Sequence, residues 1–211
     1  MSSRILTRRA GFFPQGAKTF AYRRVVELAG LTLLAAAAAL ALALLSFDAN
    51  DPSFHLASSQ KTANWLGWPG AYAADILLRS VGVAGVWPVL ALAAWGWRIS
   101  AHRGLPYWWM HVALLPLAVL LAAILAASLP APDSWPLADG LGGIIGQSLL
   151  AGALAPLAMA MGLGAGRVTL ALVAALPALA MLGFALGLTP GDWRTLGRAL
   201  VFVGAKGRAL L

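Results

Sequence analysis

The sequence predicts an all-α integral membrane protein with four transmembrane helices and one glycine-rich segment that lies in the membrane interface or re-enters it without crossing. Three observations support this prediction. Of the 211 residues, 61% are hydrophobic and only 10% are charged, whereas soluble domains carry about 25% charged residues. Several apolar runs are long enough to cross a hydrocarbon core of about 30 Å at about 1.5 Å per residue. The basic residues cluster beside these runs, as the positive-inside rule expects.

A basic segment, residues 1–24, precedes the first apolar run. It contains glycine and proline but no sustained apolar period, so we interpret it as a cytoplasmic tail that contacts anionic lipid. The apolar run that follows is longer than the h-region of a signal peptide, which favours an uncleaved signal anchor. The predicted membrane domain covers residues 25–190. Residues 191–211 are interpreted as a basic juxtamembrane segment or the start of a linker.

The first span is predicted at residues 27–45 and ends at a dense cluster of turn formers. Asp48, Asp51 and Pro52 belong to this cluster. The proline also disfavours helical geometry in the residue before it. We interpret both carboxylates as solvated turn residues, because a divalent-cation site needs further oxygen ligands.

The second span is predicted at residues 74–97, after an aromatic loop of the kind found at lipid headgroups. Gly67 and Gly70 permit a tight turn before it. Asp75 is placed in the first turn of this helix, where its N-terminus stabilises a carboxylate. Arg79 follows at the spacing of a helical ion pair. A self-neutralising pair is favoured over a proton relay, although ionisable residues within spans are often functional.

The third and fourth spans are predicted at residues 111–129 and 167–188. Between them, residues 141–163 are apolar but interrupted by glycine and proline. If this segment crossed as well, the basic C-terminal region would lie outside, against the positive-inside rule, so parity favours four spans. We expect irregular backbone here, packed against other helices that satisfy its polar groups. Gly142 and Gly146 have the GxxxG spacing of helix-packing sites.

Aromatic residues are expected to mark the cytoplasmic membrane interface. Trp95 and Trp97 at the end of the second span are predicted to form this belt, and Tyr107, Trp108 and Trp109 are predicted to anchor the third span.

No catalytic, cofactor or metal site is expected. The chain contains no cysteine, which excludes a thiolate ligand or a cysteine nucleophile. His102 and His111 lack further ligands at a metal-binding spacing. Beside an interaction protein, two alternatives stay open: a small polytopic transporter or channel subunit, which needs polar groups along an inward face, and an intramembrane enzyme, which needs a paired nucleophile and base.

Four stretches, in their order and spacing relative to the spans, resemble the N-terminal four-helix membrane domain of the FtsK/SpoIIIE DNA translocases. They are SFDANDPSF after the first span, NWLGWPGAYAADILL at the second, GGIIGQSLL after the third, and RVTLAL at the fourth. The similarity covers about residues 20–200. Its most specific residues are Ser46, Phe47, Asp51, Pro52, Ser53, Asn64, Gly67, Gly70, Ala71, Ala74, Asp75, Gly142, Gly143 and Gly146.

The resemblance implies a multi-pass protein of the bacterial inner membrane, with both termini cytoplasmic, that acts at the septum in cell division and chromosome segregation. In that family a linker and a cytoplasmic ATPase motor follow, and the motor pumps DNA. The present sequence has no GxxxxGK[ST] phosphate loop, Walker B strand or winged helix, so neither ATPase activity nor direct nucleic-acid binding is expected of it.

The expected partners are therefore the lipid bilayer, membrane proteins of the division site and further copies of the chain. Residues 46–75 and 140–166 are the expected outer contact surfaces. The candidate interaction or structural residues are Asp48, Asp51, Pro52, Asn64, Gly67, Gly70, Asp75, Arg79, Gly142, Gly143 and Gly146.

Overall fold

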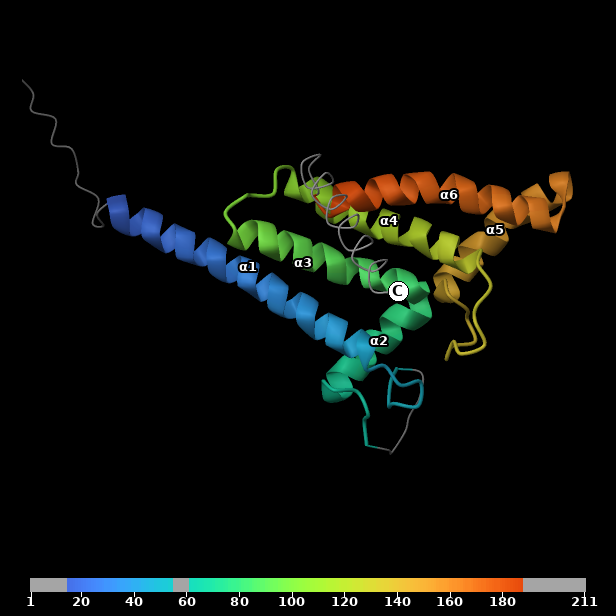
Figure 1. Cartoon of the computed structure of the whole chain (residues 1–211), viewed down its shortest axis with the longest axis horizontal. Coiled ribbons are helices and arrows are strands. Elements are labelled where there is room, and N and C mark those ends of the chain that lie inside the picture. Colours follow the sequence, from blue (N-terminus) through green and yellow to red (C-terminus); the bar gives the residue numbers. More distant parts are fainter. Residues whose placement is uncertain (1–14, 55–60, 188–211) are drawn as a thin grey trace, which may run out of the picture.

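The computed structural model describes residues 15–54 and 61–187, and every regular element within them is a helix (Figure 1). The all-α prediction is thus confirmed. Within the described residues, five helical stretches are long and apolar enough to cross a membrane, with α2 to α3 counted as one stretch. The elements are α1 (Gln15–Leu45), α2 (Gly67–Val81), the 3-10 helix η1 (Gly82–Gly85), α3 (Val86–Ser100), α4 (Trp108–Ala127), α5 (Gly143–Met161) and α6 (Leu163–Ala185).

Helix α1 is longer than a membrane crossing requires. Its 31 residues correspond to about 46 Å at the usual helical rise, against a hydrocarbon core of about 30 Å. Its N-terminal part therefore projects beyond the other helices (Figure 1). Residues 15–24, which we interpreted as part of the cytoplasmic tail, are helical and belong to α1. The rest of that tail, residues 1–14, lies outside the described residues.

Helices α1 and α3 run antiparallel and touch through their backbones. A Cβ atom built on Gly30 would lie 2.8 Å from the carbonyl oxygen of Gly96, and one on Gly96 would lie 2.8 Å from that of Gly30. A glycine on each helix at the point of contact allows the close approach that favours helix association in lipid. Helix α1 therefore packs directly on α3.

The predicted second span, residues 74–97, is not one straight helix. Gly82 adopts φ +61°, a conformation that a continuing right-handed helix does not contain. The amide of Val83 donates to the carbonyl oxygen of Leu141, at 2.9 Å, instead of to the preceding turn. Helices α2 and α3 consequently meet at a corner formed by η1 (Figure 1). The backbone polar groups freed by the break are satisfied by a distant loop, as membrane proteins require.

Helices α4 and α6 are antiparallel and enclose the core together with η1. The buried cluster consists mainly of small side chains: Val81, Ala84, Ala118, Val119, Ala122, Ala123 and Leu182. Small side chains allow short distances between helix axes. This close packing holds membrane helices together because the hydrophobic effect does not drive their association in lipid. The predicted third and fourth spans overlap α4 and α6, although α6 begins earlier than the predicted residue 167, within the glycine-rich stretch.

Helix α5 is regular over 19 residues, whereas we expected broken backbone in residues 141–163. The segment departs from helical geometry at its two ends, where Gly143 has φ +64° and Gly162 has φ +86°. From Gly143, α5 leads away from α4 and forms a hairpin with α6 that extends past the end of the bundle (Figure 1). We call this end, where residues 46–54, 61–66 and 128–142 lie, the loop end. The opposite end, with the α3–α4 connection, is the arginine end.

Candidate interaction surface at the loop end

Asp51 holds the first loop together from a buried position. Its side chain is 5% exposed. One carboxylate oxygen accepts the amide of Ala63 at 2.6 Å and the other accepts the amide of Asn64 at 2.9 Å. A carboxylate that receives two backbone amides makes charge-assisted bonds, which are stronger than neutral ones. Asp51 is therefore a structural residue of this loop.

Asn64 connects the same loop to the end of α1. Its side-chain nitrogen donates to the carbonyl oxygens of Ala43 at 2.9 Å and Ser46 at 3.2 Å. These are among the carbonyls that a helix C-terminus leaves without intrahelical partners. A Cβ atom at Gly70 would lie 2.2 Å from the Asn64 side-chain oxygen, so only glycine leaves room for this arrangement.

Asp48 and Pro52 shape the turn that follows α1. The Asp48 carboxylate accepts the amide of Asn50 at 2.8 Å, which is the side-chain-to-backbone bond of an Asx turn. Pro52 is half-buried between two buried residues, Asp51 and Ser53. Both predicted site residues thus lie in the turn, and their structural contribution is local.

Asp75 and Arg79 form the ion pair that their spacing predicts. The Arg79 Nε atom lies 2.5 Å from an Asp75 carboxylate oxygen, with Asp75 2% exposed and the Arg79 side chain 23% exposed. Asp75 is not in the first turn of its helix, because α2 begins at Gly67, which has φ +66° and forms the turn. The Asp75 carboxylate is therefore stabilised by the Arg79 cation and not by the helix N-terminus. A buried carboxylate in the middle of a helix requires such a partner.

Glycines join α2, α4 and α5 at the loop end. A Cβ atom on Gly143 would lie 2.6 Å from the carbonyl oxygen of Arg79, and one on Gly82 would lie 1.9 Å from that of Leu141. Atoms added to Gly142 and Gly146 would lie 2.5 and 2.6 Å from the carbonyl oxygen of Ala123 on α4. The predicted packing sites are therefore direct backbone contacts, and they hold the start of α5 against two other helices.

Exposed aromatic rings surround this framework. Phe54, Trp65 and Trp68 are 77%, 70% and 64% exposed. Tyr72 makes edge-on ring contacts with Phe54 at 6.2 Å and Trp68 at 5.6 Å between centroids. Aromatic residues are favoured at the membrane interface and at protein interfaces. We define the loop-end surface as the four aromatic residues Phe54, Trp65, Trp68 and Tyr72.

The arginine end has its own aromatic belt, with one correction to the prediction. Trp97 and Trp108 are exposed, but Trp95 is buried, at 8% exposure. The Trp95 indole N–H donates to the carbonyl oxygen of Ala185 at 2.6 Å. Trp95 thus joins α3 to the end of α6 because its polar tip finds a backbone partner there.

Sequence reasoning also missed a contact at this end. Both ring nitrogens of His111 face carbonyl oxygens, that of Phe184 at 2.7 Å and that of Pro106 at 3.0 Å. His111 therefore ties the start of α4 to the last turn of α6. A lone histidine beside an aromatic belt carries no sequence signal for a partner so far along the chain.

Within residues 15–54 and 61–187, no three His, Asp or Glu side chains come close enough together to hold a metal ion. The buried side chains of Asp51 and Asn64 instead bond to backbone. This arrangement can present a fixed surface to lipid or to another protein.

Comparison with known proteins gives one family. The model of the family described as "4TM region of DNA translocase FtsK/SpoIIIE" matches residues 22–193. A protein named DNA translocase FtsK from Bradyrhizobium diazoefficiens is 34% identical over 140 residues, which are 66% of this chain and 17% of the relative. A protein of the same name from Caulobacter vibrioides is 36% identical over 162 residues, 74% of this chain and 19% of the relative. No solved structure matches the chain significantly.

Proposed function

The chain belongs to the FtsK/SpoIIIE family, whose membrane region it matches, and from this premise we propose that it anchors a DNA translocase at the division septum and contacts other division proteins through its loop end. The resemblance stated from the sequence is thereby confirmed at the level of the family and its membrane domain. The chain spans less than a fifth of the length of the relatives described above. DNA translocation is therefore proposed for the translocase that these helices would anchor, and not for the helices themselves.

The proposed topology has four crossings, made by α1, by α3 with η1, by α4 and by α6. Five stretches of the described residues qualify by length and composition. We place α5 outside the count because a fifth crossing would put the basic C-terminal region on the outer side, against the positive-inside rule. Its start lies at the loop end, and it leads away from α4 rather than back along it (Figure 1). Arg98 in the last turn of α3 and Arg103 just after the helix lie at the opposite end, which we assign to the cytoplasm by the positive-inside rule.

The observation that carries the proposed contact surface is the contrast within the loop end. Asp51 and Asn64 are almost completely buried and bonded to backbone, so the two described parts of the loop are held to each other and to the end of α1. Trp65 and Trp68 on the same loop and the first turn of α2 are mostly exposed. A rigid support that displays large aromatic side chains is the arrangement found at interaction hot spots.

Localisation in dividing cells tests this proposal. A fluorescent fusion of the chain is expected at the septum, and truncating both Trp65 and Trp68 to alanine is expected to reduce septal enrichment while membrane insertion is kept. Trp108→Ala is the matched control, because Trp108 is similarly exposed, at 64%, but lies at the arginine end. If the double variant is enriched at the septum as strongly as the unmodified chain, the loop-end surface is not the contact.

A further inference from the structure

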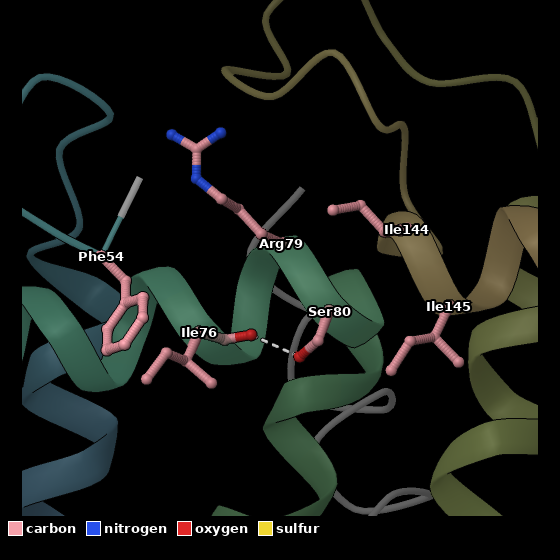
Figure 2. A pocket seen from close by; sticks show the side chains of 6 residues that line it. All are labelled: Phe54, Ile76, Arg79, Ser80, Ile144 and Ile145. Carbon is pink, nitrogen blue, oxygen red and sulfur yellow. Dashed lines mark hydrogen bonds between the residues drawn. The ribbon is translucent and has the colours of Figure 1, made fainter. Parts of the chain in front are cut away.

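A groove of about 350 Å³ lies at the loop end between α2 and the start of α5 (Figure 2). Three elements contribute to it: the first loop, α2 and α5. Its lining residues are Phe54, Ile76, Arg79, Ser80, Ile144 and Ile145. The proposed contact surface uses only Phe54 of these residues.

The wall of the groove is apolar. Ile76, Ile144 and Ile145 are 49%, 47% and 38% exposed, which is high for side chains of this type. Ser80 adds little polarity, since its hydroxyl donates to the carbonyl oxygen of Ile76 within α2. An occupant must therefore present hydrocarbon to this wall.

One cation lies at the rim. Arg79 uses its Nε atom for Asp75, and of the two partners the arginine side chain is the more exposed, at 23% against 2%. Figure 2 shows the guanidinium group pointing toward the loops, while Ile76 and Phe54 point to the other side of α2. The terminal nitrogens of a guanidinium group form a planar fork that matches a phosphate group.

We propose that this groove binds one anionic phospholipid, with its phosphate on Arg79 and an acyl chain along Ile76, Ile144 and Ile145. The inference rests on the proposed topology, which places the loop end at the outer headgroups. A cation toward the loops followed by an apolar wall toward the helices reproduces the order of polarity of a phospholipid along the membrane normal. An anionic headgroup is favoured because it brings no second cation to the half-buried arginine.

Lipid retention by the purified 211-residue chain tests the proposal. Native mass spectrometry in detergent, with added phosphatidylglycerol or phosphatidylcholine, is expected to show one retained phosphatidylglycerol per chain at concentrations where phosphatidylcholine is not retained. Ile145→Trp fills the groove and is expected to weaken retention at least about tenfold, equivalent to ~1.4 kcal/mol. Leu149→Trp is the matched control, because Leu149 is on the same helix and 40% exposed but does not line the groove.

A second variant keeps the test valid if Ile145→Trp does not fold. Arg79→Lys preserves the charge beside Asp75 but removes the planar fork that matches a phosphate group, so it is expected to weaken retention of phosphatidylglycerol. Equal retention of both lipids by the unmodified chain, or unchanged retention by the Arg79 and Ile145 variants, overturns the proposal. A dimer that Ile145→Trp abolishes also overturns it, because the occupant would then be a second copy.

The lipid site and the septal function fail separately. If the unmodified chain reaches the septum but retains no lipid specifically, the lipid site alone is refuted. Specific retention in a chain that does not reach the septum refutes the proposed function alone.

Discussion

Replacing Gly143 by alanine tests the backbone contact that joins α5 to α2. The added Cβ atom would lie 2.6 Å from the carbonyl oxygen of Arg79 and 2.7 Å from the amide nitrogen of Gly82. Both are backbone atoms, so relief requires a helix to move rather than a side chain to rotate. Gly143 also has a φ angle of +64°, a backbone conformation that residues other than glycine rarely adopt.

The two effects can be estimated separately. A left-handed conformation costs a residue with a Cβ atom about 1–2 kcal/mol, and overpacking a closely packed interior costs about 1–3 kcal/mol. Gly143→Ala is therefore expected to lower the free energy of unfolding by ~2–5 kcal/mol. A domain of this size is stabilised by only ~5–15 kcal/mol in total, so the loss is measurable and large.

Three other glycines separate the causes. Gly104 has φ +65° with nothing within 4 Å of its Cβ position, so Gly104→Ala is expected to cost only the ~1–2 kcal/mol of backbone strain. Gly146 lacks the positive φ but would place its Cβ atom 2.6 Å from the carbonyl oxygen of Ala123, so Gly146→Ala is expected to show overpacking, offset by ~1 kcal/mol of helix propensity. Gly152 has neither feature, and Gly152→Ala is expected to be neutral or stabilising by up to ~1 kcal/mol.

The measurement is reversible unfolding of the purified chain in mixed micelles titrated with dodecyl sulfate, followed by far-ultraviolet circular dichroism. The predicted order of destabilisation places Gly143→Ala first and Gly152→Ala last. A Gly143 variant no less stable than the Gly104 variant would show that the α2–α5 contact contributes nothing, and the packing described for the loop end would be refuted.

Two further substitutions report on other joints of the structure in the same assay. Asn64→Ala removes the donor that bridges the first loop to α1 and is expected to cost ~1–3 kcal/mol, whereas Asp48→Ala, in the same loop but outside this bridge, should cost much less; equal losses would contradict the assigned bridge. Trp95→Phe removes the indole N–H that bonds to Ala185 and should cost ~0.5–1.5 kcal/mol, and an unchanged midpoint would indicate that this bond contributes no stability.

Features that depend on neighbouring residues could be predicted from the sequence. The end of α1 is set by turn formers directly after it, and α1 ends at Leu45. The Asp75–Arg79 pair follows from helical spacing and is present. GxxxG spacing indicated Gly142 and Gly146 as packing positions, and both touch the backbone of α4.

Features that depend on distant residues could not. The corner at Gly82 exists because Leu141 accepts the amide of Val83, and a glycine in an apolar run gives no indication of such a partner. The dense glycines of residues 141–163 suggested broken backbone, yet α5 is regular. At its start the absence of side chains serves close contacts with α2 and α4 rather than flexibility.

The position of Trp95 illustrates the same limit. Tryptophan near the end of a span is typical of a membrane belt, and Trp97 is exposed as that pattern predicts. Trp95 is buried because the end of α6 supplies a carbonyl oxygen for its indole N–H. The sequence around Trp95 does not show where α6 ends.

The four-crossing topology is tested most directly by the sidedness of single cysteines, because the chain contains none of its own. Ala101→Cys after α3, Ala138→Cys in the second loop and Leu163→Cys at the α5–α6 turn would each be treated in intact cells with a membrane-impermeant maleimide. We predict labelling at positions 138 and 163 from outside, and at position 101 only after the inner membrane is permeabilised. Labelling of position 163 from the cytoplasmic side alone would show that α5 crosses the membrane, and the topology on which the loop-end surface and the lipid site depend would be wrong.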